Sequence, residues 1–328
     1  MKQGDWPYWL REHRGTLLAL AAFLVMFTIY ASNHPAGLNA NVANTAANKG
    51  VLLAIVAMAQ TLVVLTSGID LSVGMVLVLC NCLASSIVVG SPLQVALGTV
   101  GVLAAGALCG AINGLIVIFG RLQPIVTTIA TGAVFYGIAL ALRRVPGGDI
   151  NGTLGDALTG KLWGWLPASL VLLAGLVLVV WVPYRRSEVG RAAYAIGSAE
   201  VAAYMSGVPI RRAKFMAYTL SGLLAAVGGL FLTCVTSSGE ASAANGNTYT
   251  LYSIAAVVLG GVSLFGGSGS AIGAIFGALM FRTIGDLLFV FNLEPLWQPL
   301  FQGMVLAAAV CLGAVRLLRV RNRLELYG

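Results

Sequence analysis

Long apolar segments follow one another along almost the whole chain, and only short polar stretches separate them. A helix that crosses a bilayer needs about 20 mostly apolar residues. We therefore predict an all-α polytopic membrane protein with about ten transmembrane helices, some of them broken. The predicted spans are residues 15–32, 48–67, 71–90, 93–119, 123–142, 164–184, 213–235, 249–264, 268–291 and 297–316. We expect residues 1–328 to form a single transmembrane domain.

The composition agrees with a chain that lies mostly in lipid. Of its 328 residues, 59% are hydrophobic and only 9% are charged, whereas soluble domains are about one quarter charged. The 41 glycines suit close packing between membrane helices, because small residues let helix backbones approach each other. The five cysteines lie in apolar stretches and form no C-x-x-C pair. We therefore expect no metal site, no disulfide framework and no cofactor.

The basic residues lie mainly at the ends of the predicted spans, where they indicate the orientation of the chain. Cytoplasmic segments of membrane proteins carry an excess of Lys and Arg. An arrangement with both termini in the cytoplasm places most of the 19 Lys and Arg residues inside. The formal charge of +8 then follows from topology. We expect membrane lipid around the chain and no nucleic-acid partner, since no folded basic domain exists to hold one.

The predicted cytoplasmic loop at residues 185–214 is the most polar internal part of the chain. It contains six Lys or Arg residues between two apolar segments. Residues 198–203 favour a short helix, and the sequence Gly207-Val208-Pro209 ends it. A short helix held at both ends by membrane spans is compact and rigid, which suits a docking element.

The largest predicted periplasmic loop is residues 143–163. Its Pro, Gly and Asn residues indicate turns. Arg143 and Arg144 stand at its start, on the side that usually carries fewer cations. They either contact an acidic surface of a partner or only mark the end of the preceding helix.

Two glycine-containing motifs interrupt the apolar pattern. The first, at residues 66–74, reads TSGIDLSVG and contains the only acidic residue between Glu12 and Asp149. Two interpretations are compatible with each other: Asp70 or Ser72 caps the following helix, and Asp70 contacts the substrate at a broken helix. The second motif, at residues 257–279, has seven glycines and three serines and repeats the first weakly. It predicts tight packing around a broken helix and contains no phosphate-loop pattern.

Arg282 and Asp286 form a second polar feature, inside a predicted span. They are four residues apart, so one face of a helix carries both. Each charge is costly alone at membrane depth and tolerable in a pair. We expect the two to neutralise each other towards the bundle interior, with a proton pathway as the alternative.

Uncharged polar residues recur inside other spans. Each one alone is explained by a hydrogen bond between helices, but together they make a polar, uncharged pathway plausible. The candidates for such a pathway are Gln60, Gly68, Asp70, Ser72, Asn81, Asn113, Thr127, Thr128, Thr131 and Tyr136.

Several blocks of the sequence resemble one known family. Residues 195–214 follow the pattern A-I-G-x-x-x-x-A-A-x-x-x-G-V-P-I-x-x-x-K, which is similar to the ATPase-docking loop of ABC importer permeases. The run from Gly190, and the blocks at residues 67–74, 122–132 and 257–270, are similar to ribose/arabinose/galactose-type sugar importer permeases. These blocks keep the order of the family and spread over most of the chain.

The resemblance implies the permease subunit of a binding-protein-dependent sugar importer in the bacterial inner membrane. Such a subunit pairs with a second permease, the same or different, and with cytoplasmic ATP-binding subunits that hydrolyse ATP. It receives a neutral monosaccharide, a pentose or hexose in pyranose or furanose form, from a periplasmic sugar-binding protein, and has no catalytic activity itself. The coupling loop that the resemblance implies comprises Gly197, Glu200, Ala203, Gly207, Val208, Pro209, Arg211 and Arg212.

Two departures from the family pattern leave the sugar open. Tyr136-Gly137 stands where an Arg-Gly pair is expected, and the segment from Arg282 to Asp286 stands where an Asn-Gly pair is expected. The alternative function is a secondary transporter driven by ions or protons, for which Asp70 and the Arg282–Asp286 pair are the candidate titratable groups. A membrane enzyme ranks lower, because catalytic triads, metal clusters and paired inward carboxylates are absent from the sequence.

Overall fold

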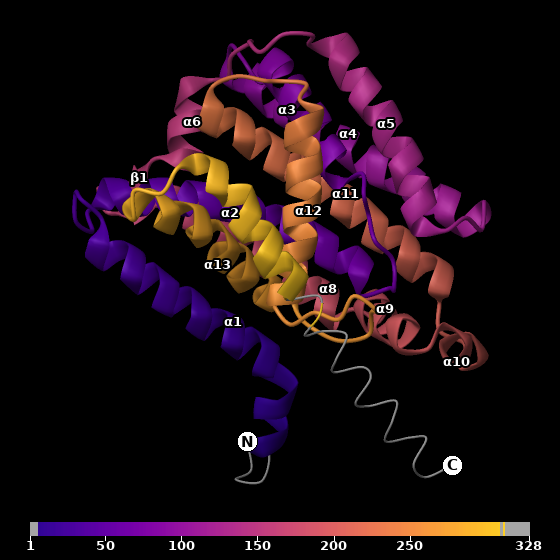
Figure 1. The fold of residues 1–328 in the computed structure, drawn as a ribbon. Helices are drawn as coiled ribbons and strands as arrows, with labels where there is room; N and C mark the ends of the chain where they lie inside the picture. Colours follow the sequence, from indigo (N-terminus) through magenta and orange to yellow (C-terminus); the bar gives the residue numbers. More distant parts are fainter. Residues whose placement is uncertain (1–5, 309–310, 312–328) are drawn as a thin grey trace.

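The structure, a computed structural model, describes residues 6–308 and 311 and is built almost entirely from helices (Figure 1). Its longer helices are α1 (Trp6–Asn33), α2 (Ala40–Val64), α3 (Val73–Ile87), α4 (Pro92–Phe119), α5 (Pro124–Leu142), α11 (Ile210–Thr236), α12 (Ala243–Leu259) and α13 (Ala271–Val290). The shorter elements are α6 (Gly152–Thr159), β1 (Lys161–Leu162), β2 (Leu166–Pro167), α7 (Ala168–Leu176), the π-helical turn η1 (Val177–Trp181), α8 (Val182–Arg186), α9 (Glu188–Ser198), α10 (Glu200–Met205) and the 3₁₀ turn η2 (Pro295–Trp297). Residues 298–308 are also helical.

The all-α polytopic class predicted from the sequence is confirmed. Among the described residues, seven helical segments are long and apolar enough to cross a membrane, and α3 is a shorter apolar helix. The predicted span at 249–264 lies about five residues too late, because α12 already begins at Ala243, where Ser242 caps it. The predicted span 297–316 extends outside the described residues. The number of ten spans and the orientation of the termini stay predictions.

Helix α2 is the centre of the bundle. Its residues from Gly50 to Val64 are all buried, with α3, α11, α12 and α13 packed around them. A helix that is apolar all round has no preferred outer face, so surrounding it with other helices is the arrangement that buries it fully. By contrast, α1 packs mainly against α13, and within residues 14–33 few of its side chains are fully buried.

Glycines allow the closest helix pairs, as the composition predicted. Helices α4 and α11 approach so closely that a Cβ atom added at Gly110 would lie 2.1 Å from the carbonyl oxygen of Tyr218. On the other helix, a Cβ added at Gly222 would lie 2.2 Å from the carbonyl oxygen of Gly106. Backbone therefore packs directly on backbone along this pair, which only small residues permit.

The helices run between two ends of the molecule, which we call the α10 end and the α6 end. The α10 end contains α9, α10, the junction at residues 65–72 between α2 and α3, and the loop at residues 260–270 between α12 and α13. At the α6 end, Gly147 and Gly239 form an isolated β-bridge, and the amide of Asn151 bonds the carbonyl oxygen of Val88. Figure 1 shows α10 projecting below the bundle and α6 on the opposite side.

Candidate functional site

At the α10 end, the polar loop of the sequence folds into a helical hairpin, α9 followed by α10. The Ser187 hydroxyl accepts a hydrogen bond from the Gly190 amide and so caps the start of α9. Helix α10 ends at Met205, and Gly207, which follows the C-cap residue Ser206, has a φ of 74° in the left-handed region. There the Gly207 amide bonds the Tyr204 carbonyl, and the Val208 amide bonds the Ala203 carbonyl. These two hydrogen bonds form a Schellman motif, so the predicted glycine stop of the short helix is present.

Helix α10 presents an apolar surface away from the bundle. Val201, Tyr204 and Met205 are 78%, 72% and 80% exposed, whereas Ala203 is buried against α9 and α11. Three large apolar side chains on a helix of six residues form a small projecting patch at an end of the bundle. A patch of this kind is typical of a surface that a partner covers.

An ion pair holds α10 against the first turn of α11. Lys214 Nζ lies 2.6 Å from Glu200 Oε1. Of the other coupling-loop candidates, Pro209, Arg211 and Arg212 are exposed beside the hairpin. The arginines are therefore available to a partner.

The hairpin rests on both glycine motifs. Gly197, near the end of α9, is so enclosed that an added Cβ would lie 2.1 Å from the Gly267 amide nitrogen and 2.2 Å from the Leu65 carbonyl oxygen. The Ser67 hydroxyl lies 2.6 Å from the Phe265 carbonyl oxygen and 3.3 Å from that of Gly197. The Gly267 amide also donates to the Leu65 carbonyl, at 3.2 Å. The two interrupted segments and the hairpin thus meet at one place.

Beyond Ser67, the junction continues into the protein and ends in a buried polar cluster around Asp70. Asp70 is only 2% exposed. Its Oδ1 atom accepts hydrogen bonds from the amide of Ser72, at 2.9 Å, and from the Ser72 hydroxyl, at 2.6 Å. The Ser221 hydroxyl reaches its other oxygen at 3.4 Å. Asp70 therefore closes a turn immediately before α3, whose N-cap residue, Ser72, makes no side-chain cap hydrogen bond.

Neighbouring helices complete this cluster. With its amide oriented to match its neighbours, Gln60 donates to the Asp70 carbonyl at 3.0 Å and accepts from the Asp70 amide at 3.3 Å. Asn113 Nδ2 donates to the Ser72 hydroxyl at 2.8 Å, and the Thr128 hydroxyl accepts from the Leu71 amide at 2.9 Å. The non-helical backbone of the junction is thereby satisfied inside the bundle, as a membrane interior requires.

The cluster includes two residues that sequence reasoning missed, Tyr218 and Ser221 of α11. The Tyr218 hydroxyl is buried without a hydrogen-bond partner, and a Cβ added at Gly68 would lie 2.8 Å from it. The two residues are three positions apart, so they share one helix face. That spacing of two polar residues in an apolar helix is the sequence signal that could have indicated them.

Other pathway candidates lie elsewhere. Asn81 belongs to a separate network at the α6 end, where its Nδ2 donates to the Thr233 hydroxyl, at 2.9 Å, and its Oδ1 accepts from the Glu240 amide, at 2.9 Å. On α5, the Thr127 hydroxyl is buried without a partner, and Thr131 bonds the carbonyl oxygen of Thr127. Tyr136 is half-buried further along the same helix.

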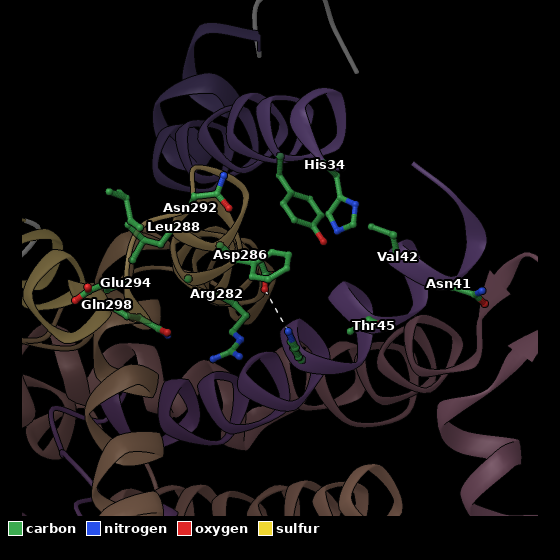
Figure 2. A pocket seen from close by; sticks show the side chains of 15 residues that line it. His34, Asn41, Val42, Thr45, Arg282, Asp286, Leu288, Asn292, Glu294 and Gln298 are labelled. Carbon is green, nitrogen blue, oxygen red and sulfur yellow. Dashed lines mark hydrogen bonds and ion pairs between the residues drawn. The ribbon is translucent and has the colours of Figure 1, made fainter. Parts of the chain in front are cut away.

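The expected Arg282–Asp286 pair is not formed within the described structure. Asp286 instead pairs with Lys49 of α2, whose Nζ lies 3.4 Å from Oδ1. The spacing of four residues places both side chains on one face of α13, but sequence spacing cannot show that α2 brings a second cation to the same carboxylate. Figure 2 shows Arg282 and Asp286 beside a crevice between α1, α2 and α13, with a dashed line marking the ion pair of Asp286.

The two arginines of the 143–163 loop differ in their surroundings. Arg143 Nη2 donates to the Ser86 hydroxyl at 2.9 Å and to the Ser85 carbonyl at 3.4 Å, so it holds the loop against the end of α3. Arg144 is exposed. Of the two, Arg144 is the one available to a partner.

Together these features define a class of protein. The chain is a polytopic helical membrane protein with an exposed helical hairpin seated on two interrupted segments. Residues 42–310 match the family described as branched-chain amino acid transport system / permease component, and the chain belongs to this family of transport permeases. The family resemblance given by the sequence motifs is confirmed.

Three relatives show the range of the family. The ribose import permease protein RbsC of Escherichia coli K12 is 33% identical over 310 residues, which is 92% of this chain and 93% of RbsC. The fructose import permease protein FrcC of Rhizobium meliloti is 33% identical, over 80% of this chain and 74% of FrcC. The autoinducer 2 import system permease protein LsrC of Enterobacter sp. strain 638 is 31% identical, over 90% of this chain and 85% of LsrC. No solved structure matches the chain.

Proposed function

We propose that this chain is the membrane permease subunit of an ATP-driven importer that carries a neutral monosaccharide, a pentose or hexose, from the periplasm to the cytoplasm. The observation that carries the proposal is the α9–α10 hairpin, with its exposed apolar patch and its seat on both interrupted segments. The ribose and fructose import permeases among its relatives support a sugar as the substrate.

In this proposal α10 is the coupling helix, and the α10 end faces the cytoplasm. The apolar patch of Val201, Tyr204 and Met205 docks into a cleft of the ATP-binding subunit. Arg211 and Arg212 lie beside the patch and meet its acidic rim. The chain performs no catalysis, because the partner subunits hydrolyse ATP.

The contacts beneath the hairpin explain how movement of α10 reaches the membrane. Gly197 has backbone on both sides, so the hairpin cannot shift without moving residues 65–67 and 265–267. Because packed interfaces switch between discrete arrangements, we propose that ATP-driven displacement of α10 re-seats both segments together. The hydrogen bonds of Asp70 tie the first segment to α3 and α11, and so carry the shift into the bundle.

The polar groups within the membrane suit an uncharged substrate. Asp70 has protein donors on both carboxylate oxygens, so it offers little to an ion. Thr127 has a free hydroxyl, which is the kind of group that bonds a sugar hydroxyl. Thr127, Thr131 and Tyr136 of α5 stay our pathway candidates.

The partners in this proposal are a second permease, cytoplasmic ATP-binding subunits and a periplasmic sugar-binding protein in the bacterial inner membrane. The periplasmic protein meets the α6 end, where Arg144 is exposed. Only a partnered permease can complete a pathway, because the Asp70 cluster is closed off within this chain.

The test is reconstitution of the copurified complex into liposomes. The sugar used for the uptake assay is the one that the purified binding protein retains. We expect uptake that needs ATP and the binding protein and that persists when a protonophore collapses the proton gradient. Uptake that a protonophore abolishes, and that does not need the ATPase, would instead support a secondary transporter.

A further inference from the structure

A polar crevice lies at the α6 end, far from α10, and the proposed transport function does not use it. It has a volume of about 710 Å³ and lies between α1, α2 and α13 (Figure 2). Charged, aromatic and amide side chains share its wall, among them His34, Lys49, Arg282, Asp286, Glu294 and Gln298. This mixture is unusual for a surface that faces lipid.

The crevice extends along the helices that line it, away from their ends at the α6 end of the molecule. Lys49 lies in the third turn of α2, which begins at Ala40, and Arg282 lies two turns before the end of α13 at Val290. With a rise of 1.5 Å per residue, both positions are roughly 12 Å along their helices from the α6 end. The hydrocarbon core of a bilayer is about 30 Å thick, so these charges lie within reach of its outer part.

One cation in the crevice has no counter-ion. Lys49 is neutralised by Asp286 at 3.4 Å. Within the part of the chain that the structure describes, the half-buried Arg282 makes no hydrogen bond or ion pair, and its Nε is buried without an acceptor. A guanidinium carries five N–H donors, and an unpaired charge at this depth is costly. An acceptor from outside the chain would remove that cost.

We propose that the crevice binds the phosphate group of a membrane phospholipid, with Arg282 as its main ligand. The planar fork of a guanidinium matches two phosphate oxygens. Glu294 in the same wall favours a headgroup that also carries an ammonium group, as phosphatidylethanolamine does. The lipid would thereby supply the acceptors that Arg282 lacks.

The surroundings of the crevice fit a lipid rather than a free anion. Helix α1 forms one wall and exposes Leu24, Val25 and Ile29, which offer a surface for acyl chains. Tyr30 and His34 pack edge to face at its end, and Phe289 is 67% exposed beside them. Tyrosine is one of the two residue types that gather where headgroups meet the hydrocarbon, and Tyr30 lines this crevice. An acidic side chain of a periplasmic partner would have to descend roughly 12 Å to reach Arg282.

The test compares the purified, delipidated transporter with its Arg282→Gln variant by native mass spectrometry and thermal unfolding. Each protein is titrated with phosphatidylethanolamine, phosphatidylglycerol or inorganic phosphate. Arg144→Gln is the matched control, because Arg144 is exposed at the same end of the molecule. Arg282→Lys keeps the charge and removes the fork.

We expect Arg282→Gln to weaken the tightest phosphatidylethanolamine site about tenfold, because a hydrogen-bonded charge pair is lost. The affinity of Arg282→Lys for phosphatidylethanolamine should lie between those of Arg282→Gln and the wild type, and the affinity of Arg144→Gln should equal that of the wild type. The wild type should bind phosphatidylglycerol more weakly than phosphatidylethanolamine. Without lipid, Arg282→Gln should be at least as stable as the wild type, since an uncompensated cation is removed.

Three results would overturn the proposal. The first is unchanged lipid binding by Arg282→Gln. This includes a variant that binds lipid like the wild type but no longer binds the periplasmic sugar-binding protein. The second is stabilisation by inorganic phosphate equal to that by lipid, which would assign the site to a free anion. The third is a large loss of lipid-free stability in Arg282→Gln, which would assign the side chain a structural role.

Discussion

The hydroxyl of Ser67 donates a 2.6 Å hydrogen bond to the carbonyl oxygen of Phe265, and so joins the junction after α2 to the loop after α12. The two residues are far apart in the sequence. The same hydroxyl lies 3.3 Å from the carbonyl oxygen of Gly197 in α9. One side chain thus contacts both interrupted segments and the proposed coupling hairpin, which makes it a sensitive point for testing the coupling.

Ser67→Ala removes this hydrogen bond without adding bulk. We expect the ratio of sugar transported to ATP hydrolysed to fall roughly fivefold, because a net hydrogen bond contributes about 1 kcal/mol to the linked arrangement. The measurement is parallel transport and ATPase assays in proteoliposomes. Ser206→Ala is the control, since that exposed hydroxyl bonds only the Ala202 carbonyl of its own helix. Equal coupling ratios in the two variants would remove Ser67 from the mechanism.

Gly197→Ala tests the tight seat of the hairpin. The new Cβ would meet the Gly267 nitrogen at 2.1 Å and the Leu65 oxygen at 2.2 Å, and neither backbone atom can rotate away. We expect a loss of about 1–3 kcal/mol in the free energy of unfolding, as for overpacked sites. Gly175→Ala in α7, which has open space around it, should be neutral or stabilising. The measurement is the midpoint of thermal unfolding in detergent. Equal midpoints for the two variants would contradict the close packing around Gly197.

Asp70→Asn separates the role of Asp70 as a hydrogen-bond acceptor from a titrating role. Asn still accepts the hydrogen bond from the Ser72 amide, so we expect the variant to fold and to keep ATP-driven uptake. Asp70→Ala loses the acceptor and should be destabilised by about 0.5–2 kcal/mol. If uptake stops in Asp70→Asn while stability is unchanged, the carboxylate itself takes part in transport, and the secondary-transporter alternative gains support.

Glu200→Arg places two cations together where the structure has a 2.6 Å ion pair with Lys214. Because Glu200 is about half exposed, we expect a small effect on stability. We expect ATP hydrolysis to lose its dependence on sugar and binding protein, because α10 is no longer held against α11. Lys214→Glu in the same chain restores opposite charges and should restore coupling. A double variant as defective as the single one would show that the pair is not the cause.

Gly207→Pro tests the end of α10 in a separate way. Proline fixes φ near −65°, whereas Gly207 has a φ of 74°, so the Schellman ending cannot form. The variant should fold, since the position is exposed with open space around it. Uptake should fall while ATP hydrolysis continues, and normal uptake would contradict the coupling role.

The sequence predicted most clearly those features that depend on neighbouring residues. A run of small helix formers predicted a short helix at residues 198–203 before the Gly207-Val208-Pro209 stop, and the structure has that helix two residues later, at Glu200–Met205. The apolar segments predicted the helical class, since each must bury or face lipid whatever its neighbours are. The sequence did not predict that α2 is buried at the centre of the bundle, because burial depends on which helices surround it.

Features that depend on contacts between distant segments were predicted less well. Local spacing favoured Arg282 as the partner of Asp286, but α2 supplies Lys49 instead. Gln60, Ser72, Asn113 and Thr128 were each candidates, yet only the fold shows that they surround Asp70 while Asn81 lies at the other end. Ser67 had no distinguishing signal, because its two partners are backbone carbonyls.

Docking of α10 on the ATP-binding subunit, from the cytoplasmic side, is the contact on which the proposed coupling depends. The most direct measurement places a photo-crosslinking amino acid at Met205, and in a second variant at Val145, which is 71% exposed near the α6 end. Both variants are irradiated in membranes that contain the assembled transporter, and the adducts are identified by mass spectrometry. We expect an adduct with the ATP-binding subunit from position 205 and none from position 145. An ATPase adduct from position 145, with none from position 205, would contradict this docking.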